Sequence, residues 1–240
     1  MKLQYHQLRK EDKIVAQQAY NGFSDKEIVW ILIATIIAAF ISFLPILPTD
    51  PLTILARILI FAGIIFLSCT VKKRIAKKHA LRIEHTVWKF SRYWYYESSY
   101  LKKPFPIGLL LPFCMGFFSL GYIQPFTFLQ FESENISSIR LLKARGYKRA
   151  LRKEFIHEAD LANTAAAGFY ALTILALLGY VLLKANIPLG FDLAKFAFAY
   201  NLWNLVPISN LDGTKLFFGS TIQWTLILIL NGTGLALLFL

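Results

Sequence analysis

The residues best suited to chemistry lie together near the end of the chain, inside an otherwise apolar stretch. Asn201 and Asn204 stand among apolar neighbours. Pro207 then interrupts the helical pattern, and Leu211-Asp212-Gly213 follows where a helix could restart. A carboxylate inside a membrane segment is costly enough to indicate a functional site. The alternative is structural, with the aspartate capping the next helix while a nearby lysine reaches to the interface.

A second group of candidate metal ligands comes earlier, in the sequence KEFIHEADL: Glu154, His157, Glu158 and Asp160. The Glu-x-x-His spacing places a carboxylate and an imidazole on about one helical turn, as in metal sites of helical bundles. The alternative is a solvated amphipathic segment leading into a membrane span, with its acidic side chains balancing the neighbouring Arg and Lys residues.

The sequence around Asp212 resembles a signature of the site-2 protease family, which consists of intramembrane zinc metallopeptidases. That signature has the form N-x-x-P-x-x-x-L-D-G, and every named position is matched here, by Asn204, Pro207, Leu211, Asp212 and Gly213. The resemblance, to small archaeal-type members, covers roughly residues 52–240 and is strongest over 200–224. It implies a site-2-protease-like core and membrane metalloendopeptidase activity in active relatives. It also implies that Asp212 corresponds to their third zinc ligand.

Active members of that family also carry HExxH near the inner end of an earlier span, with two His ligands and a Glu as general base. The corresponding window, FLSCTVKKR, places Ser68 and Lys72 at the ligand positions and Cys69 at that of the Glu. Neither Ser nor an ammonium group replaces imidazole, and Lys72 would weaken a metal bound by Asp212. The resemblance therefore predicts a pseudoenzyme without a cofactor, with zinc expected only if the protein is active.

The elements that must position these residues are membrane helices. Of the 240 residues, 56% are hydrophobic and 17% charged, against roughly 45–50% and about 25% in soluble domains, which excludes a soluble enzyme. Apolar blocks of a length that can cross a bilayer predict spans over 28–47, 52–71, 161–183, 191–207 and 222–240. The expected fold class is an all-α integral membrane protein with about five transmembrane helices plus a re-entrant segment.

The re-entrant segment is expected at residues 104–131. Basic stretches flank this block on both sides, so the chain should leave the membrane by the side it entered. Two helices would need about 40 residues, whereas this block has 28 and contains four prolines and three glycines. Its irregular backbone must then be covered by other parts of the protein.

These features divide the chain into a cytoplasmic N-terminal segment (1–27), a transmembrane hairpin (28–71), cytoplasmic basic loops around the re-entrant segment (72–160) and a three-helix core with the LDG motif (161–240). Residues 72–103 carry ten Lys or Arg against two Glu. The positive-inside rule therefore predicts a multi-pass protein of the cell membrane with a cytoplasmic N-terminus. Anionic lipid accounts for the basic patch, and nucleic acid is not an expected partner.

Three functions remain open from the sequence. The first is a catalytically inactive site-2-protease-like protein that binds a transmembrane helix or partner protein in the groove that active relatives use for substrate. The second is an active intramembrane zinc metalloprotease with substituted ligands. The third is a small transporter or channel component, because broken helices also build transport sites. Against the third, no inverted repeat is visible, and few ionisable residues beyond Arg57 and Asp212 lie inside the spans.

Overall fold

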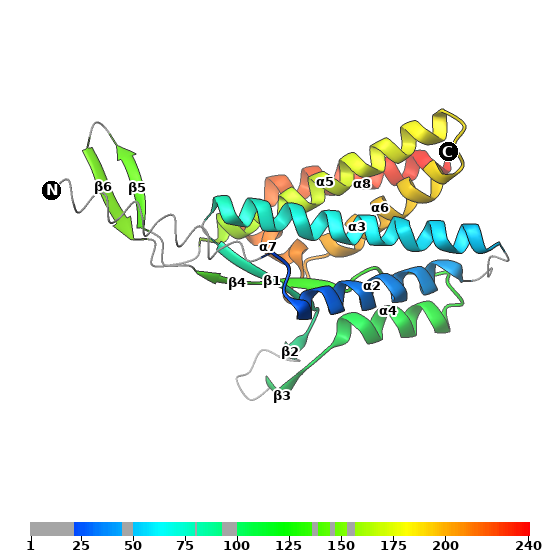
Figure 1. The fold of residues 1–240 in the computed structure, drawn as a ribbon, viewed down its shortest axis with the longest axis horizontal. Coiled ribbons are helices and arrows are strands. Elements are labelled where there is room, and N and C mark those ends of the chain that lie inside the picture. The colour runs from blue at the N-terminus through cyan, green and yellow to red at the C-terminus, as the bar shows by residue number, and fades with distance from the viewer. Residues whose placement is uncertain are drawn as a thin grey trace.

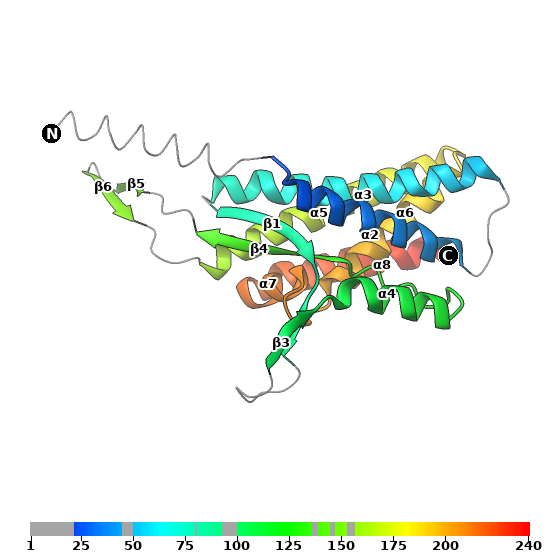
Figure 2. The same ribbon diagram turned by 60° about the horizontal axis from the view of Figure 1, so that its bottom comes forward.

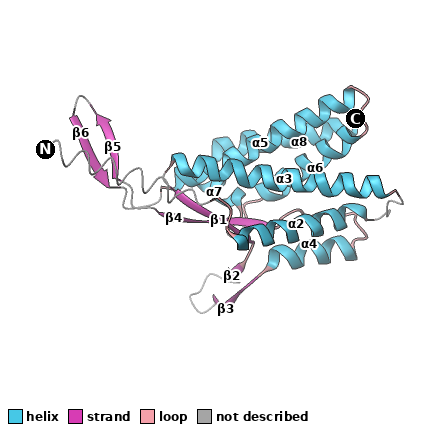
Figure 3. Ribbon diagram, in the orientation of Figure 1, coloured by secondary structure: helices cyan, strands magenta, loops and turns pink. Residues whose placement is uncertain are grey.

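The computed structural model describes residues 22–44, 50–79, 81–92, 100–135, 139–144, 147–152 and 157–240. Helices make up most of this part of the chain (Figure 3). They are α2 (Asp25–Phe43), α3 (Pro51–Lys78), α4 (Ile107–Phe118), α5 (Glu158–Lys184), α6 (Leu189–Leu205), α7 (Asp212–Gly219) and α8 (Thr221–Phe239). The strands are β1 (Leu81–Val87), β2 (Phe90–Arg92), β3 (Tyr100–Phe105), β4 (Leu129–Asn135), β5 (Ile139–Ala144) and β6 (Tyr147–Arg152).

Four of the described helices, α2, α3, α5 and α8, are long and apolar enough to cross a membrane. This confirms the coarse expectation of a helical membrane protein. The fifth expected span, over 191–207, corresponds to α6, which has only 17 residues and carries Asp192 and Lys195. It is therefore not among the four.

Helix α3 extends beyond its expected end at residue 71 as far as Lys78. The sequence predicts that these added residues belong to a basic loop. Their Lys, Arg and Ala side chains also have high helix propensity, which explains the extension of the helix. Lys72 and Ala76 are buried on this extension, on the same face as Ser68. The extension therefore carries Lys72 into the interior of the molecule.

The helices pack in two groups (Figures 1 and 2). In the first group, α5 lies against α3, α6 and α7, and α8 packs on α6. The second group consists of α2 and α4, and it joins the first through the contact of α2 with α3. The first half of α5 buries small residues, among them Ala162, Ala165, Ala166 and Gly168. Small side chains let helix backbones approach closely in lipid, and this places α5 at the centre of the first group.

Between β3 and β4, the segment 104–131 contains α4, a turn at 119–123 and residues 124–128, which we call the extended return. The turn contains Leu120 and Gly121 with positive φ, and the chain then runs back to β4 at the end from which it came (Figure 2). The amide of Gln124 donates hydrogen bonds to the carbonyl oxygens of Ile41 (3.2 Å) and Leu44 (3.1 Å). These bonds attach the return to the end of α2. A re-entrant path within a bilayer stays a prediction.

The strands are absent from the sequence-based expectation, so an all-α description is incomplete. They form three two-stranded antiparallel sheets, β1–β4, β2–β3 and β5–β6. In the first, the register runs from Leu81 opposite Asn135 to Val87 opposite Leu129. Alternate residues of β1, from Leu81 to Val87, are buried, so this strand has one face toward the helices. It connects the end of α3 with the end of the extended return.

Candidate functional site

The LDG motif lies where α6 ends and α7 begins. Val206 is extended (φ −60°, ψ 125°), as expected for a residue that precedes proline. Helix α7 then starts at Asp212, where the helix dipole favours negative charge. A Cβ at Gly213 would meet the carbonyl groups of Leu205 and Asn204. Glycine at this position therefore lets α7 begin directly against the last turn of α6.

Helix α3 contacts this motif through Lys72. Ser68 and Lys72, four residues apart, share a helix face, and both are buried, as is Cys69. A Cβ on Gly168 of α5 would meet the Cε atom of Lys72. The absence of a side chain there provides the room in which the aliphatic stem of Lys72 lies.

The ammonium group of Lys72 forms a direct, hydrogen-bonded ion pair with Oδ2 of Asp212. The two side chains are only 8% and 3% exposed. The other carboxylate oxygen, Oδ1, is buried without a hydrogen-bond partner among the described residues. Lys215, one turn further along α7, donates to the carbonyl oxygen of Phe131 and lies over its ring. The centre of the site is thus a buried carboxylate neutralised by a lysine from α3.

These residues do not fit a zinc centre of the site-2 protease type. A tetrahedral zinc site needs lone-pair donors such as imidazole, thiolate or carboxylate. The protonated Lys72 has no lone pair, and its positive charge would repel a divalent cation held by Asp212. Within the described part of the chain, no three His, Cys, Asp or Glu side chains are placed to hold a metal ion.

The structure describes three of the four residues of the second candidate cluster, and Glu154 lies outside the described residues. His157 and Glu158 are exposed, while Oδ1 of Asp160 pairs with Nδ1 of His79 at 2.8 Å. A metal site at this cluster stays a prediction.

The two asparagines near the motif connect helices. The amide of Asn201 donates to Oδ1 of Asn231 (2.9 Å) and to the carbonyl oxygen of Phe169 (3.1 Å), which joins α6 to α8 and α5. The amide of Asn204 donates to the carbonyl oxygen of Phe126 at 2.8 Å. This bond holds the extended return against the end of α6, beside the LDG motif.

A second buried network, within electrostatic range of Lys72, was not expected from the sequence. The carboxylate of Glu27 accepts hydrogen bonds from the backbone N–H of His85 (2.7 Å) and from Lys73 (2.5 Å), and lies 3.2 Å from Nδ1 of His85. Glu27 and His85 are 2% and 1% exposed. The network ties β1 to α2 and α3. A glutamate at the polar border of the first span was its only signal in the sequence.

Burial alone would lower the pKa of His85, but the neighbouring Cys69 and the Glu27 carboxylate raise it above its ordinary value. A raised pKa means that the folded state binds the proton more tightly than the unfolded state. The stability gained is therefore present below about pH 6.5, the unfolded pKa, and is lost as the pH rises through the folded pKa. We expect the Tm advantage of the native protein over His85→Gln to shrink as the pH rises above 6.5.

Thermal denaturation in detergent across this pH range measures that difference. The exposed His157→Gln variant serves as the control and should follow the native protein. A Tm difference that widens with rising pH would show that His85 is not held in its charged form.

Comparison with family models, with curated proteins and with solved structures finds no match for this chain.

Proposed function

We propose that this protein is a site-2-protease-like membrane protein that has lost catalysis and binds a transmembrane helix or a partner membrane protein. The observation that carries the proposal is the buried ion pair between Lys72 and Asp212. In an active relative, the aspartate of LDG would bind zinc and the HExxH helix would supply the other ligands. Here the helix in that position supplies a fixed positive charge instead, so the carboxylate is neutralised without a metal.

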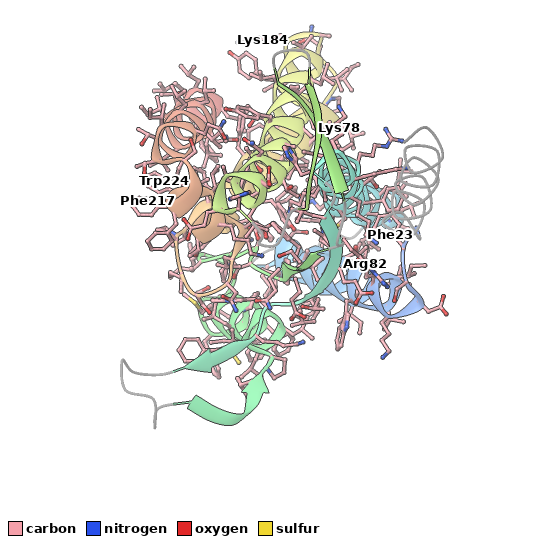
Figure 4. The ribbon with its side chains drawn as sticks, turned by 90° about the vertical axis from the view of Figure 1, so that its left-hand side faces the viewer. Phe23, Lys78, Arg82, Lys184, Phe217 and Trp224 are labelled. Atoms are coloured by element: carbon pink, nitrogen blue, oxygen red, sulfur yellow. The ribbon has the colours of Figure 1, made fainter. Side chains whose placement is uncertain are left out.

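In this proposal, the extended return and helices α6, α7 and α8 form the binding groove. The extended return is fixed to α6 by Asn204, and Gly213 keeps α7 close to it. Helix α7 is braced on α8 by an edge-to-face contact of Phe217 with Trp224 (Figure 4), and the indole N–H of Trp224 donates to the carbonyl oxygen of Leu205 at 2.8 Å. Ile208, in the break between α6 and α7, is 49% exposed. In the proposed complex, this exposed apolar side chain contacts the partner helix.

Site-specific photocrosslinking in native membranes tests this binding role. A photoreactive amino acid at Ile208 should give a discrete crosslink to a membrane protein. Ile229 on α8 is a matched control because it is also an exposed isoleucine, at 55%, and there only lipid adducts are expected. Identical patterns at both positions would contradict the proposed groove.

The main rival is an active metalloprotease with substituted ligands. Reconstitution with a membrane-protein substrate distinguishes the two functions. An active protease would cleave the substrate and would lose that cleavage in the Asp212→Ala variant. We expect no cleavage from the native protein or from the variant. A transporter would instead give solute flux in reconstituted vesicles. Either Asp212-dependent cleavage or flux would overturn the proposal.

A further inference from the structure

A cavity of about 620 Å³ lies away from the LDG motif, between the extended return and α6. It is lined from the end of α2, the early turns of α3, the turn after α4 and the face of α6, by residues that include Arg57, Gln124, Lys195 and Trp203. We call it the Arg57 cavity. The two charged residues in its lining are both cations.

Arg57 is held in one orientation. Its Nε donates to Oδ2 of Asp192 at 3.1 Å and its Nη1 to the carbonyl oxygen of Ser42 at 2.9 Å. The rings of Phe43 and Phe196 lie 6.0 and 5.8 Å from its guanidinium carbon. These contacts fix a planar donor group at the cavity wall, and such groups suit carboxylate and phosphate oxygens.

Lys195 gives the cavity an excess of positive charge. Asp192 offsets Arg57, but no carboxylate among the described residues lies within 4.0 Å of the Lys195 ammonium, which lies 5.5 Å from the centre of the Phe196 ring. An anion in the cavity could pair with this charge.

Both cations lie near the first turns of their helices. Arg57 is six residues into α3 and Lys195 six residues into α6, so each lies about 9 Å along its helix. The 28 residues of α3 extend over about 42 Å, which is close to the thickness of a bilayer with its headgroups. Tyr122 and Ile123, in the turn that lines the cavity, are 84% and 45% exposed, so apolar surface for an acyl chain adjoins the charged wall.

We propose that the Arg57 cavity binds the phosphate group of an anionic phospholipid, with Arg57 and Lys195 as its charged donors. The headgroup lies between α6 and the turn after α4, and its acyl chains lie against the exposed side chains of that turn. This site is separate from the proposed partner groove and does not depend on the loss of catalysis.

Native mass spectrometry of the full chain in detergent tests this site. The probes are phosphatidylglycerol, phosphatidylcholine and inorganic phosphate, each titrated against the native protein. We expect a bound phosphatidylglycerol, with weaker binding of the zwitterionic lipid. Lys195→Gln should weaken phosphatidylglycerol binding about fivefold, the effect of one lysine near an anionic surface. Lys184→Gln, an exposed lysine at the end of α5, should leave it unchanged.

A second variant protects the test against misfolding. Arg57→Gln/Asp192→Asn removes both members of the ion pair, so that no unpaired carboxylate remains, and should also weaken phosphatidylglycerol binding. Equal affinity for the two lipids, or equal effects of the Lys195 and Lys184 variants, would overturn the proposal. Binding of inorganic phosphate as tight as that of phosphatidylglycerol would assign the cavity to free phosphate and overturn the lipid assignment.

Discussion

Lys72→Met should destabilise the protein by about 3–5 kcal/mol, because it leaves the Asp212 carboxylate buried without its partner. The pair is almost completely excluded from solvent, with side-chain exposures of 8% and 3%, so solvent cannot replace the lost ammonium. For a chain of this size the loss corresponds to a fall of roughly 10 °C in Tm. Thermal denaturation in detergent measures it.

The matched control is Lys78→Met, a lysine on the same helix that is exposed and should change Tm little. The double variant Lys72→Met/Asp212→Asn removes both charges and should recover most of the loss, since apolar or neutral replacements of a buried ion pair are often tolerated. If the single variant behaves like the Lys78 control, or the double variant is no better than the single one, the ion pair does not neutralise Asp212 in the folded protein.

The triple variant Ser68→His/Cys69→Glu/Lys72→His should bind zinc. It rebuilds HExxH on α3, placing two imidazoles at i and i+4 on the face that already carries the partner of Asp212. Removal of the Lys72 ammonium also frees the carboxylate to act as third ligand. We expect about one zinc per protein in this variant by elemental analysis, and a loss of that zinc when Asp212→Asn is added.

The single variant Lys72→His provides the control, because it offers at most one imidazole and should bind zinc weakly. A folded triple variant that takes up no zinc would show that α3 and the LDG motif do not correspond to the two ligand-bearing elements of a site-2 protease. Zinc that persists in the added Asp212→Asn background would place the metal elsewhere.

The membrane helices could be predicted from the sequence because their signal is long and continuous. The block beginning at Ile28 and the one beginning at Leu52 correspond to α2 and α3, which begin at Asp25 and Pro51. The end of α3 could not be placed, since VKKRIAKK is as suitable for a solvated loop as for a helix. Only the packing of α3 against α5 and the contact with Asp212 place Lys72 in the interior.

The strands, in contrast to the membrane helices, have only a short signal in the sequence. Residues 81–87 alternate, with Leu81, Ile83, His85 and Val87 buried on one face, and this period of two was available in the sequence. The alternating segment is short and lies within a strongly basic region, and the charge of that region favours a cytoplasmic loop. The partner strand β4 is 42 or more residues away along the chain, and that pairing has no local signal.

At the site, the sequence placed Ser68, Cys69 and Lys72 opposite Asp212 only through the resemblance to site-2 proteases. The direct contact of Lys72 with Asp212 is a three-dimensional fact that residue types alone could not give. The same holds for Gly168, whose role is to leave space for a lysine stem. The pairing of Glu27 with His85 joins the start of α2 to β1. The position of Glu27 at the polar border of the first span is a signal in the sequence, but it does not identify His85 as the partner.

The pairing of Lys72 with Asp212 is tested most directly by an experimental density map of the native protein purified and kept in the presence of zinc. We expect continuous density between the ammonium of Lys72 and the carboxylate of Asp212, with no ion between them. A tetrahedral ion held by Asp212 and two other protein donors would contradict it.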